Sequence, residues 1–312
     1  MFWLFSPRFL SDLCPHLLRI FLPSFAMQVL INLPSSYFGL MDNFSGLIEF
    51  YIGASWSLYY AWQKQGKSLE FRQILVTCYV LLWSLRLGSF LIYRMFRRDP
   101  RDARVIQLEK KYGRLARFAL WLLPHAFWSM ICCLPMALLH AFPLVDDNFN
   151  AIDLIGSIVW ICGFLIEAIA DWNKLKAKLA EKKKYYHLGS LWNYSRNPNH
   201  CGEVFCWLGL SIISLNLVFY HPEYHYNLLM VIFSLISPLF TLFIMLFEAT
   251  LSSEVNNNKR FHSQIDYHQY RKQTSLLWPI SPNIYSRLPQ WMKRMIFFEW
   301  NMYNKGLKHA VE

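Results

Sequence analysis

Residues 151–170 read AIDLIGSIVWICGFLIEAIA, an apolar run whose only charged residues are Asp153 near its start and Glu167 near its end. A helix of about 20 apolar residues crosses the hydrocarbon core of a bilayer. The stretch therefore predicts a transmembrane helix. Asp153 stands at the beginning of this helix, where a carboxylate commonly caps the first turn.

Similar apolar runs recur along the 312 residues, so we expect an all-α fold, a polytopic bundle of six to seven tilted transmembrane helices. The first of these runs is the weakest, because Pro23 and Pro34 interrupt it. Small residues let membrane helices approach closely, and Gly156, Gly163 and Gly209 are expected to do so. The predicted spans lie near residues 18–40, 44–62, 73–93, 118–141, 151–170, 203–220 and 226–250.

Composition and charge agree with a membrane protein. The chain is 55% hydrophobic and 16% charged, whereas soluble domains average about 25% charged residues. The net charge of +11 arises mainly in 94–117, in 171–202 and after residue 251, which places these segments and the C-terminus in the cytoplasm. Loop 63–72 runs against this rule, because it also carries three basic residues. Basic loops of this kind do not indicate nucleic-acid binding.

The chain reads as one membrane domain with two flanking segments. Residues 1–43 form an N-terminal segment with the weak span, and residues 44–282 form the membrane domain. Residues 283–312 mix aromatic and basic side chains, which predicts an amphipathic helix lying at the membrane interface. The seven cysteines contain no C-x-x-C pair, so no metal site is expected, and nucleotide-binding glycine motifs are absent.

A polar block interrupts the apolar pattern at Gly189 to Val204, which reads GSLWNYSRNPNHCGEV. Polar, irregular backbone so close to membrane-length helices is unfavourable unless it lines a watery or ligand-filled cavity. Glu167 and Asp171 stand four residues apart on one helix face, and Glu203 opens the next span. The sequence therefore predicts that these carboxylates meet a polar ligand at the cytoplasmic side of the bundle.

Four ordered blocks carry a resemblance to bacterial membrane proteins related to steroid 5α-reductases. The third block, Gly189 to Glu203, resembles the family pattern G-L-W-x-x-S-R-H-P-N-Y-F-G-E. Together the blocks cover about residues 44–282. The other three are Trp83 to Gly88 running on to Arg101, Gly163 to Trp172, and Glu254 followed by Tyr267 to Pro279.

The resemblance implies an NADPH-dependent reductase of a carbon–carbon double bond in a lipophilic, steroid- or isoprenoid-like substrate. Basic and amide side chains suit the negative charges of NADPH. On the substrate side, Glu49 stands where relatives usually carry Asp before a Trp, and Tyr93 is the nearest phenol, so both are expected to be catalytic; a structural ion pair between Glu49 and Arg86 is the alternative. The expected cofactor-binding residues are Asp171, Lys178, Arg196, Asn199, Glu203 and Tyr270.

The block departs from the family pattern at several ring positions. The family's His after Arg196 is Asn197 here, and its Tyr and Phe after Asn199 are His200 and Cys201. Two other readings therefore stay open: an S-adenosylmethionine-dependent membrane methyltransferase, which shares an R-H-P-x-Y-x-G block, and a non-enzymatic lipid-binding membrane protein. The expected location is the plasma membrane if the chain is bacterial and the endoplasmic reticulum if it is eukaryotic.

Overall fold

The structure is a computed structural model that describes residues 7–27, 30, 45–97, 110–113, 123–144, 148–180, 189–221 and 228–307. All regular structure within these ranges is helical, apart from one isolated parallel β-bridge between Ser195 and Ser275. The all-α prediction is confirmed.

The chain divides into two compact units, which are described separately. Unit 1 comprises residues 1–160 and 207–238, and unit 2 comprises residues 161–206 and 239–312. Three long helices contribute residues to both units, namely α8 (Ala151–Leu179), α9 (Pro198–Ser214) and α11 (Leu228–Ile244). The tail after residue 282 belongs to the same unit as the polar block.

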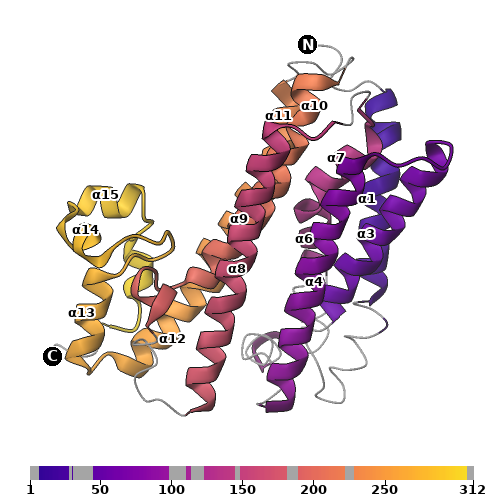
Figure 1. Cartoon of the computed structure of the whole chain (residues 1–312). Coiled ribbons are helices and arrows are strands. Elements are labelled where there is room, and N and C mark those ends of the chain that lie inside the picture. Colours follow the sequence, from indigo (N-terminus) through magenta and orange to yellow (C-terminus); the bar gives the residue numbers. More distant parts are fainter. Residues whose placement is uncertain are drawn as a thin grey trace. The chain divides into compact units, whose positions relative to one another are not determined.

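Unit 1 is built from helices that run alongside one another (Figure 1). Its apolar centre is aromatic: Phe50 lies with its ring 5.2 Å from Trp83, 4.9 Å from Trp128 and 5.6 Å from Trp207, measured between centroids. Its own helices are α1 (Pro7–Met27), α3 (Ser45–Lys64), α4 (Phe71–Arg97), α6 (Leu123–Cys132), α7 (Leu134–Ala141) and α10 (Asn216–Tyr220).

A buried ion pair fixes the start of α8 within unit 1. The Arg72 guanidinium donates to both carboxylate oxygens of Asp153, at 2.9–3.2 Å, and Asn216 donates to the same carboxylate at 2.9 Å. The cap of α8 is Asn150 rather than Asp153: the Asn150 side chain accepts from the Asp153 amide, and Asp153 accepts from the Asn150 amide. Asp153, the predicted cap, is therefore the third residue of the helix, which returns a hydrogen bond to the Asn150 amide in a capping box.

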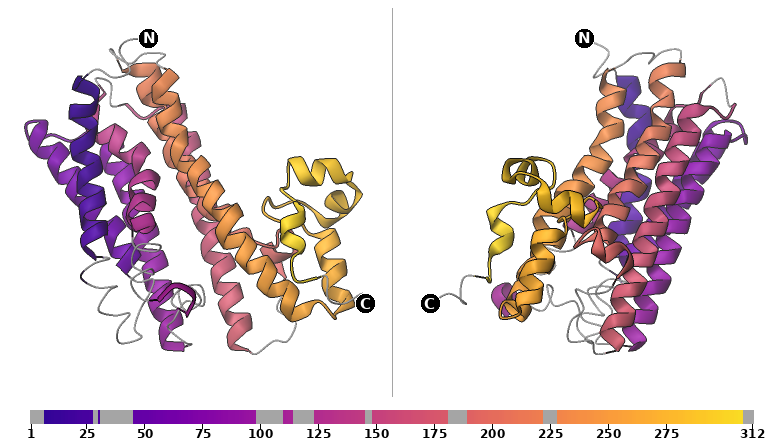
Figure 2. Two further views of the ribbon diagram at one scale, coloured as in Figure 1. Left: turned by 180° about the vertical axis from the view of Figure 1, so that it is seen from behind. Right: turned by 60° about the vertical axis from the view of Figure 1, so that its left-hand side comes forward.

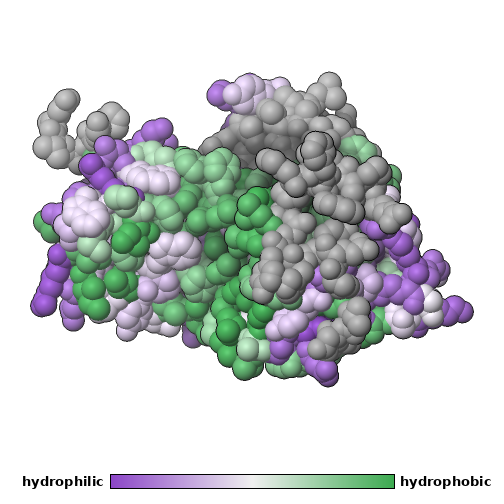
Figure 3. Space-filling view, turned by 90° about the horizontal axis from the view of Figure 1, so that it is seen from above, coloured by the Kyte–Doolittle hydropathy of each residue, from purple (hydrophilic) through white to green (hydrophobic). Residues whose placement is uncertain are grey.

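Four helices within the described residues are long and apolar enough to cross a bilayer: Phe71–Arg94, Ala151–Leu179, Pro198–Tyr220 and Met230–Phe261. On α8 the exposed side chains include Ile158, Leu165 and Ile169, and hydrophobic side chains cover a broad part of the surface (Figure 3). Apolar surface of this extent is typical of a multi-pass membrane protein.

Three predicted spans differ from the helices observed. The predicted 44–62 span is helical as α3, but it is not among the four helices that meet the length and hydropathy requirements. The predicted 118–141 span is divided at Cys133, because Pro135 lacks the amide hydrogen that would continue the helix. In place of a span over 18–40, α1 ends at Met27, and most of the remaining stretch lies outside the described residues.

Glycines allow α8 and α9 to touch along their backbones, as predicted. In unit 1 a Cβ added to Gly156 would lie 2.8 Å from the Gly209 carbonyl oxygen. In unit 2 a Cβ added to Gly163 would lie 2.6 Å from the carbonyl oxygen of Gly202, a further glycine in the polar block. No side chain fits at these positions without moving a helix, so the glycines set the distance between the two helices.

Unit 2 combines the C-terminal part of α8 and the N-terminal part of α9 with several short helices. Figure 2 shows the C-terminal helices in yellow beside α12. The tail is two short helices and a 3-10 turn rather than one continuous amphipathic helix, because Pro289 separates the two helices. The elements are η5 (Met245–Thr250), α12 (Leu251–Phe261), α13 (Ile265–Gln273), α14 (Pro282–Arg287), α15 (Gln290–Met295) and the 3-10 helices η4 (Ser190–Asn193) and η6 (Asn301–Asn304).

Candidate functional site

The polar block enters unit 2 as an irregular segment held by backbone hydrogen bonds. Gly189 has a φ of 69°, which turns the chain into η4. The Arg196 amide then donates to the Ser275 carbonyl at 2.8 Å, and the Ser195 hydroxyl donates to the Leu277 carbonyl at 2.7 Å. Pro198 begins α9, where its missing amide hydrogen costs no hydrogen bond within the helix. These contacts fix the backbone on both sides of Arg196.

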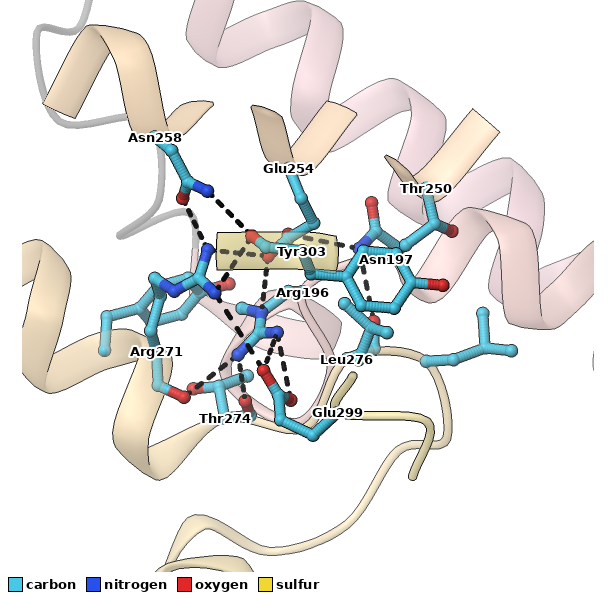
Figure 4. Close-up of polar contacts among 12 residues, drawn as sticks. Arg196, Asn197, Thr250, Glu254, Asn258, Arg271, Thr274, Leu276, Glu299 and Tyr303 are labelled. Atoms are coloured by element: carbon cyan, nitrogen blue, oxygen red, sulfur yellow. Dashed lines mark hydrogen bonds and ion pairs between the residues drawn. The ribbon is translucent and has the colours of Figure 1, made fainter. Parts of the chain in front are cut away.

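The Arg196 side chain is 3% exposed and lies at the centre of a buried ionic cluster (Figure 4). Its Nη2 donates to both carboxylate oxygens of Glu299, at 2.7 and 3.0 Å. Its Nη1 donates to the backbone carbonyls of Arg271 and Thr274, at 3.0 and 3.2 Å. Its Nε lies 3.1 Å from Glu254 Oε2, an ion-pair contact whose alignment falls short of a hydrogen bond. All five N–H donors of this guanidinium thus face protein acceptors.

Arg271 shares the same carboxylates from the other side. Its Nη1 donates to Glu254 Oε2 at 3.0 Å and to Asn258 Oδ1 at 2.5 Å, and its Nη2 donates to Asn304 Oδ1 at 2.9 Å. Glu299 Oε1 lies 3.9 Å from Arg271 Nη2. The two arginines and two glutamates balance in charge, which makes it tolerable to bury three ionised groups and to bury the fourth, Glu299, in part.

Burial and mutual attraction set the pKa values of this cluster. Burial by itself lowers the pKa of Arg196, but the carboxylates of Glu254 and Glu299 more than offset it, so the pKa is raised above its ordinary value. Burial, with Glu254 adding to it, raises the pKa of the Tyr267 phenol to about 12. Burial, with Glu299 adding to it, likewise raises the pKa of Tyr285. At neutral pH the arginine is therefore charged and these phenols are neutral hydrogen-bond donors.

The C-terminal tail completes the cluster, which the predicted interfacial helix did not anticipate. The Tyr285 hydroxyl donates to Glu299 Oε2 at 2.9 Å. Tyr303 is buried, and its hydroxyl donates to the Leu246 carbonyl at 2.9 Å. The Asn258 amide donates to the carbonyls of Tyr303 and Lys305 at 2.8 and 2.9 Å. The tail is thus folded against unit 2 by specific polar contacts.

A second group of predicted residues lies on α8 and on the first turns of α9. Asn199 and Glu203 stand four apart on α9, and the intervening Gly202 packs against the backbone of Glu167 on α8. Asn199 is partly exposed, yet its Oδ1 atom is buried and has no hydrogen-bond partner. Asp171 and Glu203 are partly buried and both have partners within the chain. Arg196, by contrast, pairs with Glu254 and Glu299 and not with Glu203.

Tyr270 and Lys178 lie on the elements next to these residues. The Tyr270 hydroxyl donates to the Trp192 carbonyl at 2.9 Å, and the Trp192 indole donates to the Ala170 carbonyl of α8 at 3.2 Å. Burial raises the pKa of Tyr270 above its ordinary range, with Glu254 adding to this and Arg196 opposing it. Lys178 is partly exposed in the last turn of α8. Trp192 therefore connects α13 to the helix that carries Asp171 and Lys178.

The two predicted catalytic residues belong to unit 1 and are treated apart from the cluster. Glu49 on α3 is fully buried, and the Ser24 hydroxyl of α1 donates to its Oε2 at 2.5 Å. Tyr93 on α4 is 37% exposed, with the Arg97 guanidinium 5.6 Å from its ring centroid. Glu49 is thus a buried carboxyl group that accepts a hydrogen bond from α1, whereas Tyr93 lies at the surface of the unit.

Comparison with known proteins identifies the family of the chain. A family model described as "Protein of unknown function (DUF1295)" matches residues 31–274, which is most of the chain. The chain belongs to this family. Searches of curated proteins and of solved structures gave no significant match.

The limits of the DUF1295 match divide the ionic cluster. Arg196, Glu254 and Arg271 lie inside the matched region, whereas Glu299 and Tyr303 lie beyond its end at residue 274. Likewise, α1 precedes its start at residue 31. In this chain, segments outside the family match supply the second carboxylate of the cluster and the helix that contacts Glu49.

Sequence reasoning missed Glu299 and Arg271 as partners of Arg196. One signal was available for the first: Glu299 is the only acidic residue between 283 and 307, in a segment otherwise basic and aromatic. A lone carboxylate in such a segment favours pairing with a cation elsewhere. Arg271 carried no comparable signal, because it is one of many basic residues after residue 251. Its partners are fixed only by the packing of α13 against α12.

Proposed function

We propose that the protein is a membrane-embedded, NADPH-dependent reductase of a carbon–carbon double bond in a lipophilic substrate, within the steroid 5α-reductase-like superfamily. The observation that carries the proposal is the Gly189 to Glu203 block. It resembles the cofactor-binding block of those enzymes, and in unit 2 it is anchored on the Arg196 cluster. Asn199 Oδ1, buried and without a partner, is the kind of acceptor that a carboxamide or ribose hydroxyl would satisfy.

In this proposal the chain's own residues hold the nucleotide. Asn199 and Glu203 share a face of α9 and would accept hydrogen bonds from it, as would Asp171 on α8. The cationic side chains Lys174 and Lys178, in the last turns of α8, are partly exposed and would attract its phosphates. Tyr270 holds Trp192 in position. NADPH, when bound, supplies the hydride.

Arg196 has a different role in the proposal from the one that the resemblance implies. Because its Nη1 and Nη2 groups donate to two carbonyls and to Glu299, and its Nε forms an ion pair with Glu254, it anchors the segment before α9. A phosphate would reach it only by displacing the Glu299 carboxylate. We therefore assign direct nucleotide contact to Asn199 and Glu203 rather than to Arg196.

Glu49 and Tyr93 are proposed to act on the substrate. Hydride addition to an enone needs a hydrogen-bond donor or acid at the carbonyl oxygen. Glu49 supplies a buried carboxyl group for this role. Tyr93 supplies a phenol at the surface of the same unit.

The membrane arrangement belongs to the same proposal. We propose six to seven spans, with the three basic segments, the C-terminus and hence unit 2's polar block on the cytoplasmic side, where NADPH is available. The membrane would be the plasma membrane of a bacterium or the endoplasmic reticulum of a eukaryote.

A non-enzymatic lipid-binding protein is the second candidate, and one observation favours it. The charges of the Arg196 cluster balance one another within unit 2, so the cluster stabilises this unit without any ligand. The methyltransferase alternative has no comparable structural support.

Cofactor titration of the purified protein separates these functions. Saturating ligand stabilises a protein by about 2.7 kcal/mol at 100 times its Kd, so thermal unfolding in detergent should shift upward with NADPH and not with S-adenosylmethionine. Asn199→Ala should weaken NADPH binding roughly tenfold, about 1.4 kcal/mol, without lowering the unfolding midpoint. Asn193→Ala, an exposed amide on η4, is the matched control. Stabilisation by S-adenosylmethionine alone would overturn the reductase proposal, and stabilisation by neither would favour the non-enzymatic one.

A further inference from the structure

The two helices of the C-terminal tail, α14 and α15, expose large apolar side chains. Ile284 on α14 is 55% exposed, and Trp291 and Met295 on α15 are 61% and 74% exposed. Trp291 and Met295 stand four residues apart, so they share one face of their helix. Tyr285 and Phe297 of the same segment are buried, with ring centroids 5.3 Å apart. The tail thus packs against unit 2 through some of its aromatic side chains and leaves an apolar surface uncovered.

Basic side chains alternate with these apolar ones. Arg287 follows Ile284 by three residues on α14, and Arg294 follows Trp291 by three residues on α15, so each arginine shares a face with an exposed apolar side chain. Both arginines are exposed, and neither forms an ion pair with any residue that the structure describes. The one carboxylate between residues 283 and 307 is already paired within the ionic cluster.

The exposed residues of α14 and α15 are therefore both apolar and positively charged. We call this surface the tail face; it consists of Ile284, Arg287, Trp291, Arg294 and Met295.

Hydrogen bonds connect the tail face to the ionic cluster. The Glu299 amide donates to the Lys293 carbonyl at 2.9 Å, and the Trp300 indole donates to the Arg294 carbonyl at 3.0 Å. The Lys293 ammonium lies 4.7 Å from the ring centroid of Tyr285, which joins α15 to α14. Because the Glu299 carboxylate pairs with Arg196, the face is held in place by buried groups of unit 2.

The tail is also attached to a helix long enough to cross the membrane, at the point where that helix becomes polar. The helix Met230–Phe261 is apolar through η5, whereas α12 carries three consecutive asparagines. Tyr303 contacts both parts: its hydroxyl donates to the Leu246 carbonyl, and its carbonyl accepts from the Asn258 amide. Figure 2 shows the yellow tail beside this helix. A spanning helix becomes polar where it leaves the hydrocarbon core, so the tail lies near a bilayer surface.

We infer that the tail face binds the surface of an anionic phospholipid leaflet. Water would leave its apolar side chains uncovered, whereas the hydrocarbon core excludes arginine. The interface accommodates both kinds of side chain, and tryptophan is enriched there. Arg287 and Arg294 have no carboxylate within the described residues, so the negative charge that they lack is supplied by the headgroups.

The inference goes beyond the proposed function. The tail face contains none of the nucleotide-binding or substrate-side residues, and it lies after residue 274, where the DUF1295 match ends. It also goes beyond the interfacial helix that the sequence predicted, because the structure shows which side chains are exposed and that two arginines among them lack partners within the described chain.

Hydrogen–deuterium exchange of the full-length protein in nanodiscs tests the inference. One set of nanodiscs contains phosphatidylcholine, and the other an equimolar mixture of phosphatidylcholine and phosphatidylglycerol. Each basic residue near an anionic surface contributes about 1 kcal/mol, so amides of residues 282–296 should exchange roughly fivefold more slowly, or slower still, in the anionic nanodiscs. Arg287→Gln combined with Arg294→Gln should abolish this difference. Lys272→Gln, at an exposed basic residue of α13 outside the tail face, is the matched control and should retain it.

A salt series on the unaltered protein keeps the test independent of whether the variants fold. Raising the salt from about 0.1 M to about 1 M shortens the Debye length to about 3 Å and should remove the difference between the nanodiscs. The inference is overturned by equal exchange in the two nanodiscs, or by a difference that survives in the double variant or at high salt. It is also overturned if the same amides become protected in detergent as the protein concentration rises, because a second copy of the chain then covers the face.

Discussion

The two units of this chain use opposite means to order their interiors. Unit 1 centres on Phe50 and its tryptophan neighbours, and contacts between hydroxyl and imidazole groups link His16, Ser57, His140 and Thr77. Unit 2 centres on two arginines and two glutamates that bring together the polar block, α12, α13 and the tail. Aromatic packing tolerates partial loss, because each contact is weak. A buried ionic cluster does not, because removing one charge strands its partners.

The strongest test of this contrast removes the central cation of unit 2. Arg196→Ala leaves Glu254 and Glu299 with Arg271 as the one remaining cation of the cluster, so we expect a loss of about 3–5 kcal/mol in the free energy of unfolding. Denaturant titration in detergent micelles measures it. Lys272→Ala, at an exposed basic residue beside Arg271, should change stability by less than about 0.5 kcal/mol. Equal stability of the two variants would contradict the ionic account of unit 2.

Neutralising the tail carboxylate should have a smaller effect. Glu299→Gln keeps the shape of the side chain but weakens two charge-assisted hydrogen bonds to Arg196, which predicts a loss of about 1.5–3 kcal/mol. Limited proteolysis should then cleave the tail more rapidly. Asp266→Asn, an exposed acid on α13, should lose less than about 1 kcal/mol. If the tail stays equally protected in Glu299→Gln, this carboxylate does not hold it.

A substitution in the aromatic centre of unit 1 should lower the free energy of unfolding by a smaller amount. Phe50→Leu retains an apolar side chain and loses edge-to-face contacts with Trp83 and Trp128, so about 1–2 kcal/mol is expected. Tyr51→Leu is the neighbouring control, because Tyr51 is 49% exposed. The contrast between aromatic packing in unit 1 and the ionic cluster in unit 2 would be contradicted if Phe50→Leu lowered the free energy of unfolding as much as Arg196→Ala.

Alkaline pH should weaken unit 2 through its buried phenols. The pKa of Tyr267 is raised from an ordinary 10.0 to about 12 in the folded protein. Its contribution is fully present below the unfolded value and is lost as the pH rises toward 12, because the unfolded chain releases the proton first. At a pH of about 11 the expected loss is about 1.4 kcal/mol. Stability measured between pH of about 9 and 12, with Tyr267→Phe as the comparison, should reveal this decline, and an identical decline in the variant would exclude Tyr267 as its source.

The order of apolar, glycine and proline residues in the sequence predicted those helices whose ends are set by neighbouring residues. The 151–170 run appears within α8, and the three predicted glycines lie at α8–α9 contacts, because helix packing of this kind depends on residue size. Within the predicted 118–141 span the helix is interrupted at Cys133, because Pro135 cannot donate a backbone hydrogen bond, and the high hydrophobicity of the surrounding sequence concealed this interruption. The roles of Asp171, Lys178, Asn199, Glu203 and Tyr270 stay predictions, as do those of Glu49 and Tyr93.

The sequence by itself determined that this chain is helical and apolar enough for a membrane, and that its polar block is exceptional, since hydropathy and motif spacing are properties of adjacent residues. Only the tertiary structure decided which charges meet. Arg196 joins Glu299 across 103 positions, and His16 joins His140 through Ser57. Such pairings depend on how separate helices pack, and the Coulomb energy that selects them acts over a few ångströms in space, whatever the distance along the chain.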